Sequence, residues 1–309
     1  MLSKLKGKRL FRGIIQGLLL VIGIMAVYIG LDQVFPPAEP ILKPVAVDAG
    51  TSSLKEQIRY VAVGDSLTEG IGDQTKRGGF VPIVAEDLQS RYKLTGVEVE
   101  NYGISGERSD QILKRLKQDK KLRDHLKTAD FVTVTVGGND LMKVIQNSFF
   151  TLTMKKFDKP REKYQERVTE IIEEIRALND GVPVYVLGIY NPFYLNFPEI
   201  TDMQKVVDDW NAATESATAQ FSKSHFIPIN DLLYQGLDQE VGVASESSDS
   251  ANANTGTAAS AENDLDRVDN NVLYEDDKFH PNNIGYQLMA NAVRDQLIKS
   301  QDEWLKTEE

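Results

Sequence analysis

Four short polar blocks carry the residues of this sequence that could do chemistry. They read GDSLTEG (Gly64–Gly70), NYGISGE (Asn101–Glu107), GGND (Gly137–Asp140) and DKFHPN (Asp277–Asn282). Between them they hold a serine, an aspartate and a histidine, with a glycine and an asparagine that can donate hydrogen bonds to a developing anion. These are the groups needed to cleave an ester through a covalent acyl intermediate. One such block could arise by chance, whereas four in this order indicate a catalytic site.

Ser66, Asp277 and His280 are the candidate catalytic triad. His280 is the expected general base, because His125 lies in a charged helical pattern and His225 opens a predicted strand. Asp277 precedes His280 by three residues and can accept a hydrogen bond from the far ring nitrogen, which stabilises the imidazolium. The same pair could bind a metal ion, but no second histidine or carboxylate cluster with ligand spacing accompanies it in the sequence. We therefore expect neither a metal nor an organic cofactor.

Donor groups beside these residues could stabilise the anion that forms when Ser66 attacks a carbonyl carbon. We expect the backbone N–H groups of Ser66 and Gly106 and the side-chain amide of Asn139 to converge on that oxygen as an oxyanion hole. The serine lies in Gly-Asp-Ser-Leu-Thr and not in G-x-S-x-G. This difference excludes the nucleophile elbow of the α/β-hydrolases.

The four blocks, in this order, resemble those of the GDSL, or SGNH, family of serine hydrolases, in particular the bacterial lysophospholipase L1-like esterases. The resemblance covers about residues 58–299. It implies that Ser66 is the nucleophile, that Gly106 and Asn139 donate to the oxyanion, and that the Asp-x-x-His pair supplies and orients the base. It also implies that Asp65 stabilises the turn and takes no part in the reaction.

The fold that this resemblance implies is a flavodoxin-like three-layer α/β/α sandwich around a five-stranded parallel sheet. In its strand order the first three strands are neighbours, so the ends that carry Ser66, Gly106 and Asn139 can meet. The residues themselves indicate the same class, because short strands rich in Val and Ile alternate with helix-length segments. Ligands in such sheets bind beyond the carboxyl ends of the strands, where the polar blocks fall. The strand candidates are Ile58–Val63, Val97–Tyr102, Phe131–Val136, Val182–Ile189 and His225–Asn230.

Helical spacing of apolar residues predicts two of the covering helices. One lies between the third and fourth strands and includes residues 164–178. The last helix is expected to begin at Pro281, whose fixed φ suits a first turn, and to bury Ile284, Leu288 and Val293.

Residues 13–31 predict a membrane anchor. This stretch of 19 residues has no charge and one internal polar residue, Gln16. As a helix it would span about 28 Å, close to the thickness of a bilayer core. Five of the 35 basic residues and no acidic residue lie in residues 1–12, which places the N-terminus in the cytoplasm. A cleaved signal peptide is the alternative, although no small-x-small site follows directly. Either way, the catalytic body is expected outside the cytoplasmic membrane.

The chain therefore divides into a basic cytoplasmic tail (1–12), a transmembrane signal anchor (13–31), a tether (32–56) and a hydrolase domain (57–309). Within the domain, residues 241–266 are rich in Ser, Ala, Asn and acidic residues and nearly lack large apolar side chains. This composition predicts a disordered insertion, because too little apolar surface is available to offset the entropy of ordering. The insertion is expected to be a tolerated surface loop, or alternatively a mobile flap beside the DKFHPN block.

Charge and cysteine content exclude several classes of function. The net charge is −11, and the basic residues of the N-terminal tail make the remaining chain more acidic still. An acidic body argues against nucleic acid as a partner, because binding to phosphates requires a basic face. The absence of cysteine excludes disulfides, thiolate metal sites and a cysteine nucleophile.

Two apolar segments could form the walls of the substrate site. Residues 142–157 follow the GGND block and residues 188–197 follow the fourth strand, so both lie at the same end of the predicted sheet. Such walls favour a lipid or a fatty ester as substrate. Alternatively, these residues pack against the domain or on the membrane. The candidate substrate contacts are Phe149, Phe150, Asn191 and Phe193.

Together these features predict a membrane-anchored serine esterase with a single span and an extracellular catalytic domain. Its expected substrate is an acyl ester, with lysophospholipid or another fatty acyl ester favoured. One alternative is a carbohydrate O-acetylesterase that acts on cell-envelope glycans, which an open and shallow aromatic site would favour. The other is a non-catalytic envelope-binding module, against which stands the presence of every residue of the proposed machinery.

Overall fold

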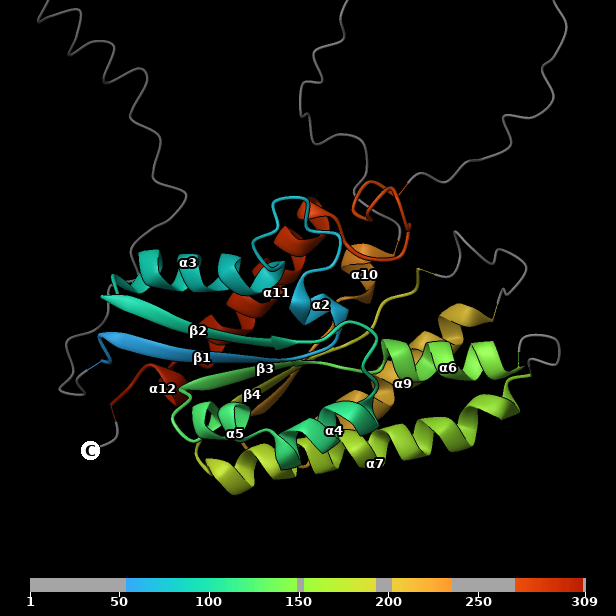
Figure 1. Cartoon of the computed structure of the whole chain (residues 1–309), viewed down its shortest axis with the longest axis horizontal. Coiled ribbons are helices and arrows are strands. Elements are labelled where there is room, and N and C mark those ends of the chain that lie inside the picture. The colour runs from blue at the N-terminus through green and yellow to red at the C-terminus, as the bar shows by residue number, and fades with distance from the viewer. Residues whose placement is uncertain (1–53, 149–152, 193–201, 235–269, 308–309) are drawn as a thin grey trace, which may run out of the picture. The chain divides into compact units, whose positions relative to one another are not determined.

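A five-stranded parallel sheet lies at the centre of the computed structural model, which describes residues 54–148, 153–192, 202–234 and 270–307 (Figure 1). The strands lie in the order β2-β1-β3-β4-β5, and each neighbouring pair is parallel. The predicted α/β class and the neighbouring first three strands are confirmed. The strand bounds are β1 (Gln57–Gly64), β2 (Gly96–Gly103), β3 (Phe131–Thr135), β4 (Val184–Leu187) and β5 (Ser224–Ile227).

Helices cover both faces of the sheet, which gives the three layers seen in Figure 1. One face carries α3 (Phe80–Tyr92), α11 (Asn283–Lys299) and α12 (Gln301–Trp304). The other face carries α4 (Ser109–Gln118), α5 (Lys120–Leu126), α7 (Lys155–Leu178) and α9 (Met203–Thr218). The helices α2 (Ser66–Glu69), α6 (Gly138–Ser148) and α10 (Asn230–Leu233) begin just beyond the carboxyl ends of β1, β3 and β5.

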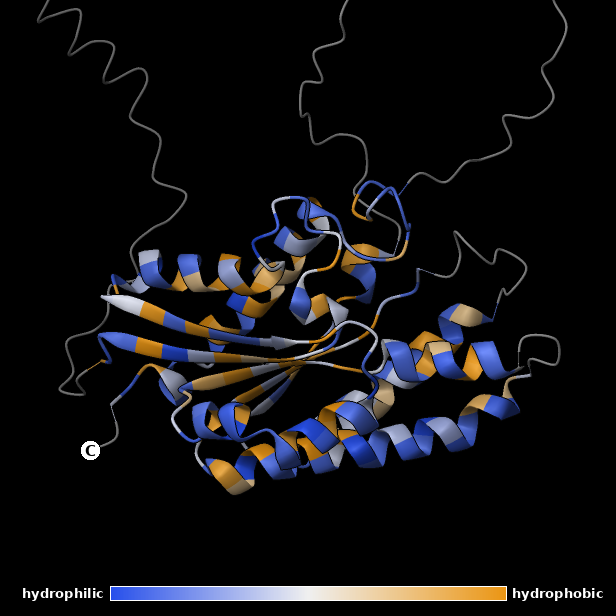
Figure 2. Cartoon of the chain, viewed as in Figure 1, coloured by the Kyte–Doolittle hydropathy of each residue, from blue (hydrophilic) through white to orange (hydrophobic). Residues whose placement is uncertain are grey.

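The strand β1 shows how the sheet separates the two cores. Val61 and Val63 belong to the apolar cluster formed with α4, α5, α7 and α9, whereas Tyr60 and Ala62 belong to the cluster formed with α3, α11 and α12. Successive residues of a strand point to opposite faces, so a run of apolar residues fills both cores. In Figure 2 the central strands are accordingly apolar, while the outward surfaces of α4, α5 and α7 are hydrophilic.

The last helix begins at Asn283, two residues later than predicted. Asn282 is its N-cap, and the Asn282 side-chain oxygen accepts hydrogen bonds from the N–H groups of Ile284 (2.9 Å) and Gly285 (3.1 Å). An asparagine at this position satisfies two of the free N–H groups of the first turn. Pro281 instead pairs with Leu273 in an isolated β-bridge.

Burial along α11 also differs from the prediction at one position. Val293 is fully buried and Leu288 is partly buried against the same core, as predicted. Ile284 is 43% exposed, because it lies in the first turn on the side away from the sheet. Tyr286 and Met289 are buried in its place.

Several predicted segments lie outside the described residues. These are the tail (1–12), the anchor (13–31), residues 32–53 of the tether and the insertion (241–266). The end of the tether is described: Leu54 pairs with Lys306, and the Lys55 ammonium lies 2.6 Å from the Asp130 carboxylate. Across the described ranges, no helix combines the length and the apolar character needed to cross a membrane.

Candidate active site

The predicted triad residues come from two ends of the domain and meet beyond the carboxyl end of β1. Ser66 is the first residue of α2, directly after β1, and His280 lies in the loop before α11. The His280 Nε2 atom is 2.9 Å from the Ser66 hydroxyl oxygen. The His280 Nδ1 atom is 2.6 Å from the Asp277 carboxylate. A ring that donates from Nδ1 to the carboxylate leaves the Nε2 lone pair free to accept the serine proton.

Asp277 is held in place by three hydrogen bonds. Its Oδ1 atom accepts from the backbone N–H groups of Phe279 (2.9 Å) and His280 (3.0 Å), while Oδ2 faces the imidazole. Partial burial alone would raise the pKa of Asp277, but the hydrogen bonds from His280 and Phe279 outweigh it and lower the pKa below its usual range. The carboxylate is therefore ionised at neutral pH and can stabilise an imidazolium.

The turn that presents Ser66 is fixed by Asp65. The Asp65 Oδ1 atom accepts hydrogen bonds from the Leu67 N–H (3.1 Å) and from the Thr135 hydroxyl (2.8 Å), so Asp65 caps α2 and ties it to β3. Burial raises the pKa of the Asp65 carboxyl against these two hydrogen bonds. Gly64 is required in front of it, because a Cβ there would lie 2.2 Å from the Thr135 hydroxyl oxygen.

The predicted oxyanion residues lie on the loop after β2 and at the start of α6. One N–H of the Asn139 side-chain amide donates to the Glu107 carbonyl oxygen (2.9 Å), which joins the two segments. Asn139 lines the same pocket as Ser66, whereas Gly106 is exposed and is not among the residues that line this pocket. Gly106 has φ +80°, and a Cβ there would meet no atom within 4 Å. Glycine is favoured here by backbone conformation and not by lack of space.

Two further side chains, Asp140 and Arg115, hold this loop in place. The Asp140 carboxylate accepts from the Ser109 N–H (2.8 Å) and the Ser109 hydroxyl (2.6 Å). Burial raises the pKa of Asp140 against these hydrogen bonds. Arg115 donates to the Tyr102 carbonyl (2.9 Å) and lies 2.7 Å from the Glu107 carboxylate. These contacts fix the residues on both sides of Gly106.

The loop that carries His280 is anchored to neighbouring segments. The Tyr190 hydroxyl donates to the Phe279 carbonyl oxygen, and burial raises the pKa of Tyr190 well above its usual value, so this hydroxyl stays protonated. The Tyr286 hydroxyl donates to the Ile71 carbonyl (2.6 Å). The loop after α2 thereby contacts the helix that follows His280.

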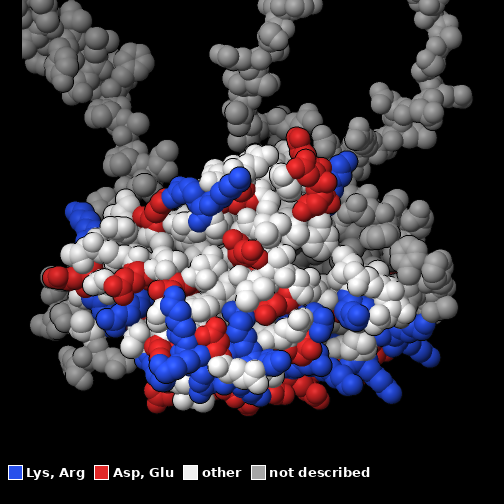
Figure 3. Space-filling view, viewed as in Figure 1, with Lys and Arg blue, Asp and Glu red and all other residues white. Residues whose placement is uncertain are grey.

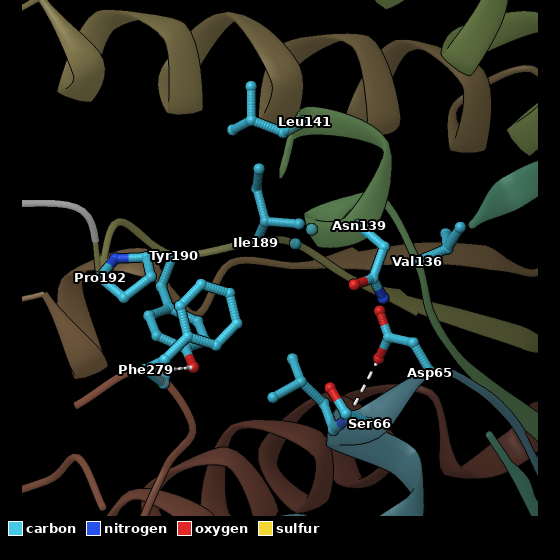
Figure 4. Close-up of a pocket in the computed structure, with 12 residues that line it drawn as sticks. Asp65, Ser66, Val136, Asn139, Leu141, Ile189, Tyr190, Pro192 and Phe279 are labelled. Atoms are coloured by element: carbon cyan, nitrogen blue, oxygen red, sulfur yellow. Dashed lines mark hydrogen bonds between the residues drawn. The ribbon is translucent and has the colours of Figure 1, made fainter. Parts of the chain in front are cut away.

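A narrow apolar pocket opens beside Ser66, with a cavity volume of about 30 Å³. Figure 4 shows Asn139, Asp65 and Ser66 along one side and Tyr190, Phe279 and Pro192 facing them. A volume of this size holds only one or two water-sized groups. The pocket therefore has room for a short acyl group beside the serine. Its apolar lining comes from Leu67, Val136, Leu141, Ile189, Tyr190, Pro192 and Phe279.

The model of the GDSL-like lipase/acylhydrolase family matches residues 62–288, which include all four polar blocks. The chain belongs to this family. Uncharacterized protein YpmR of Bacillus subtilis (strain 168) is 35% identical over 251 residues, which cover 81% of this chain and 86% of that protein. An acetylxylan esterase of Geobacillus stearothermophilus is 25% identical over 177 residues, which cover 55% of this chain and 74% of that enzyme.

The fold also matches solved structures of GDSL-like enzymes. The crystal structure of the lipase Lip_vut3 from a goat rumen metagenome superposes with a TM-score of 0.59 at 22% identity, covering 77% of this chain and 96% of that one. The family contains lipases and esterases, so ester hydrolysis is the class of chemistry that its members share.

Of the four substrate contacts predicted for this GDSL-like chain, only Asn191 lies among the described residues. Asn191 is 2% exposed and does not line the pocket; its side-chain amide donates to Gln204 (3.1 Å). Ile189, Tyr190 and Pro192 line the pocket instead. Phe149, Phe150 and Phe193 lie outside the described residues.

The predicted wall at residues 142–157 is also replaced. Its described residues do not line the Ser66 pocket, and Leu141, one residue earlier, does. Met142 and Val144 pack against the apolar core instead. Sequence reasoning missed Phe279 as a pocket residue, although its place beside His280 in the fourth block was a signal for it. Within the described ranges, no three His, Asp or Glu side chains are grouped as metal ligands.

Proposed function

We propose that this protein is a serine esterase that hydrolyses acyl esters through an acyl-enzyme on Ser66. The observation that carries the proposal is the continuous chain of hydrogen bonds from Ser66 through His280 to Asp277 at the edge of an apolar pocket. Nucleophile, base and orienting carboxylate lie within the distances that proton transfer requires.

In the proposed reaction the Ser66 oxygen attacks the ester carbonyl carbon while His280 Nε2 accepts the hydroxyl proton. The tetrahedral intermediate collapses, and the imidazolium gives this proton to the leaving alcohol. Water then attacks the acyl-enzyme, with His280 taking a proton from the water and returning it to Ser66. Asp277 stays ionised throughout and stabilises the imidazolium, as its lowered pKa favours.

We place the former carbonyl oxygen, which becomes negatively charged, on the side of the pocket that carries Asn139. One Asn139 N–H is taken by Glu107, and the amide has a second N–H for the substrate. The backbone N–H groups of Ser66 and Gly106 are the other proposed donors. Groups fixed before the reaction stabilise such charge without a cost of reorganisation.

The apolar lining of the pocket supports an acyl ester, with a lysophospholipid or another fatty acyl ester as the favoured substrate; the pocket would hold the carbons next to the carbonyl, and the rest of the chain would extend beyond it. Leu67, Val136, Leu141 and Ile189 offer no hydrogen-bonding side chain for a sugar hydroxyl. They suit the hydrocarbon part of an acyl group.

A second candidate is a carbohydrate O-acetylesterase that acts on cell-envelope glycans. The small volume of the pocket favours a two-carbon acyl group over a long one. The similarity to an acetylxylan esterase is compatible with this candidate. For either substrate, we propose a membrane-anchored enzyme with an extracellular catalytic domain, supported by the uncharged stretch at 13–31 and the basic residues before it.

The test is hydrolysis of p-nitrophenyl esters with acyl chains of about two to sixteen carbons by the full chain in an ester-free detergent. An optimum at long chains supports the fatty ester, and activity confined to acetate supports the deacetylase. Ser66→Ala should abolish turnover, and Ser90→Ala, on the exposed face of α3, is the matched control. Turnover by Ser66→Ala close to that of the control would refute the serine mechanism.

A further inference from the structure

A second and larger cleft lies between α4, α6 and α7, with Trp210 of α9 among its lining residues. Its volume is about 320 Å³, against about 30 Å³ for the Ser66 pocket. Asn139 lines the Ser66 pocket and Asp140 lines this cleft, so the first turn of α6 separates the two. The cleft is thus distinct from the proposed catalytic centre.

Basic side chains dominate the lining of the cleft. They are Arg108, Lys143, Lys159, Lys163 and Arg167, against two acidic residues. Figure 3 shows this excess as a group of Lys and Arg side chains at the lower right, over the N-terminal half of α7, where few acidic side chains interrupt it. The whole chain carries a net charge of −11, so the local sign is opposite to that of the molecule.

The two acidic residues of the cleft do not neutralise its lysines. Asp140 is bound by Ser109 and lies 3.7 Å from Arg167. Asp110 is paired with Arg108 at 3.1 Å. Across the described ranges no ion-pair partner accompanies the three lysines, Lys143, Lys159 and Lys163.

The spacing of two of these lysines is unfavourable for the helix itself. Lys159 and Lys163 lie four residues apart on α7, where like charges face each other and destabilise a helix. Lys143 adds a third positive charge from α6. An anion between the two helices would turn this repulsion into attraction.

The indole of Trp210 forms part of the wall of the cleft. Trp210 is fully buried, and its Nε1–H has no hydrogen-bond partner among the described residues. A buried donor without an acceptor is costly and uncommon in folded proteins. Because Trp210 lines the cleft, its indole N–H signal can report on changes in packing there, although the N–H itself is enclosed by protein atoms.

We propose that this cleft binds a phosphate-type anion. A phosphate group offers several strong acceptor oxygens and up to two negative charges, which suits the three lysines and Arg167 that line the cleft from α6 and α7. The group could belong to a soluble phosphate ester or to the headgroup of a phospholipid. The proposal does not depend on the esterase reaction, because none of the proposed catalytic residues lines the cleft.

The chain contains only two tryptophans, Trp210 and Trp304, so the indole N–H signal of Trp210 can report on the cleft. Inorganic phosphate is titrated into the ¹⁵N-labelled full chain at constant ionic strength, with chloride as the replaced anion, and Trp304→Phe assigns the two signals. We expect a saturable shift of the Trp210 signal with phosphate and none with acetate at the same ionic strength.

Lys159→Gln with Lys163→Gln should weaken phosphate binding at least about tenfold, because each charged hydrogen bond contributes on that scale. The matched control is Lys114→Gln with Lys299→Gln, which removes the same charge from exposed lysines elsewhere on the domain. An unchanged midpoint of urea unfolding shows that the variants are folded. An equal loss of phosphate binding in the control pair would overturn the proposal, since charge alone would then explain it.

Two further probes identify the source of the group. Glycerol 3-phosphate represents a soluble ester, and dihexanoyl phosphatidylglycerol represents a lipid headgroup. Tighter binding of the lipid points to a phospholipid, and equal or tighter binding of glycerol 3-phosphate points to a soluble ligand. If no phosphate probe gives a saturable shift of the Trp210 signal, or if acetate gives the same shift, the cleft is not a phosphate site.

Discussion

The two sides of the proposed catalytic machinery are fixed in different ways. On the nucleophile side, Ser66, His280 and Asp277 contact one another directly, so the groups that would react also hold the geometry. On the oxyanion side, the Asn139 side chain donates to the backbone of its neighbouring loop at the Glu107 carbonyl, and the Ser109–Asp140 contact supports the same loop. Motifs predict the reacting groups and the oxyanion donors, whereas only the folded chain reveals the Ser109–Asp140 contact that supports the oxyanion loop.

The pKa values of the aspartates on the two sides are also shifted in opposite directions. For Asp277, hydrogen bonds from His280 and Phe279 outweigh partial burial and lower the pKa. For Asp140, burial dominates and raises the pKa despite the two hydrogen bonds from Ser109. One carboxylate is kept charged to serve the proposed chemistry, and the other is buried to tie two segments together.

The largest effect is expected on the nucleophile side, from Asp277→Asn. An asparagine at this position can favour the wrong tautomer of His280 and cannot stabilise the imidazolium, so kcat should fall by about 10³–10⁴. Steady-state kinetics on a p-nitrophenyl ester measures the loss. Asp276→Asn, in the same loop and bound to Tyr274, is the control and should retain near-full activity. A loss of kcat of less than tenfold for Asp277→Asn would show that the contact between Asp277 and His280 contributes little to the reaction.

On the oxyanion side, Asn139→Ala removes a proposed donor and should lower kcat by about 10²–10³. It also removes the bond to the Glu107 carbonyl, so thermal unfolding is measured alongside the kinetics. Asn147→Ala, exposed on the same helix, is the matched control. Wild-type kcat in Asn139→Ala would remove this residue from the proposed oxyanion hole.

The same contrast explains what the sequence could and could not predict. The residue types and their order along the chain were enough to predict Ser66, Asp277 and His280 as the triad. The pattern of apolar strands predicted the sheet, at whose carboxyl edge Ser66 and Asn139 lie. Asn191 does not line the pocket; its side-chain amide donates to Gln204 of α9, and no local pattern in the sequence reveals that contact.

The supporting residues were missed for a physical reason. Ser109 and Asp140 lie 31 residues apart, and no local pattern links them. The start of α11 was misplaced because Asn282 competes with Pro281 for the first turn, and the cap with two hydrogen bonds decides it. Contacts that depend on tertiary structure are therefore the part that the sequence left open.

A third, smaller effect tests the support of the oxyanion loop. Ser109→Ala removes the 2.6 Å bond to Asp140 but keeps the backbone N–H bond, so the loop should loosen without unfolding. We expect kcat to fall about tenfold with little change in KM, because a displaced donor stabilises the transition state less well. Ser109→Thr keeps the hydroxyl and should restore most of kcat. A rise in KM alone, or no rescue by threonine, would argue against a positioning role.

The smallest effect is expected on stability: the contributions of Asp277 and Asp140 to the free energy of unfolding should depend on pH in opposite directions. The folded-state pKa of Asp277 lies below the unfolded value of about 3.9. Its contribution is therefore full above that value and is lost as the pH falls through the folded pKa. The folded-state pKa of Asp140 is raised. Its contribution is present below the unfolded pKa and is lost as the pH rises through the folded pKa.

Urea unfolding of the full chain between about pH 3 and 8 measures both contributions. The free energy of unfolding of the wild type minus that of Asp277→Asn should increase with pH, whereas the difference from Asp140→Asn should decrease. The slopes are diagnostic, because only the titration of each carboxyl group makes its difference vary with pH, whereas changes in packing shift that difference by an amount that varies little with pH. Two slopes of the same sign would mean that the pKa values of Asp277 and Asp140 are shifted in the same direction. The proposed difference between the two sides of the site would then be wrong.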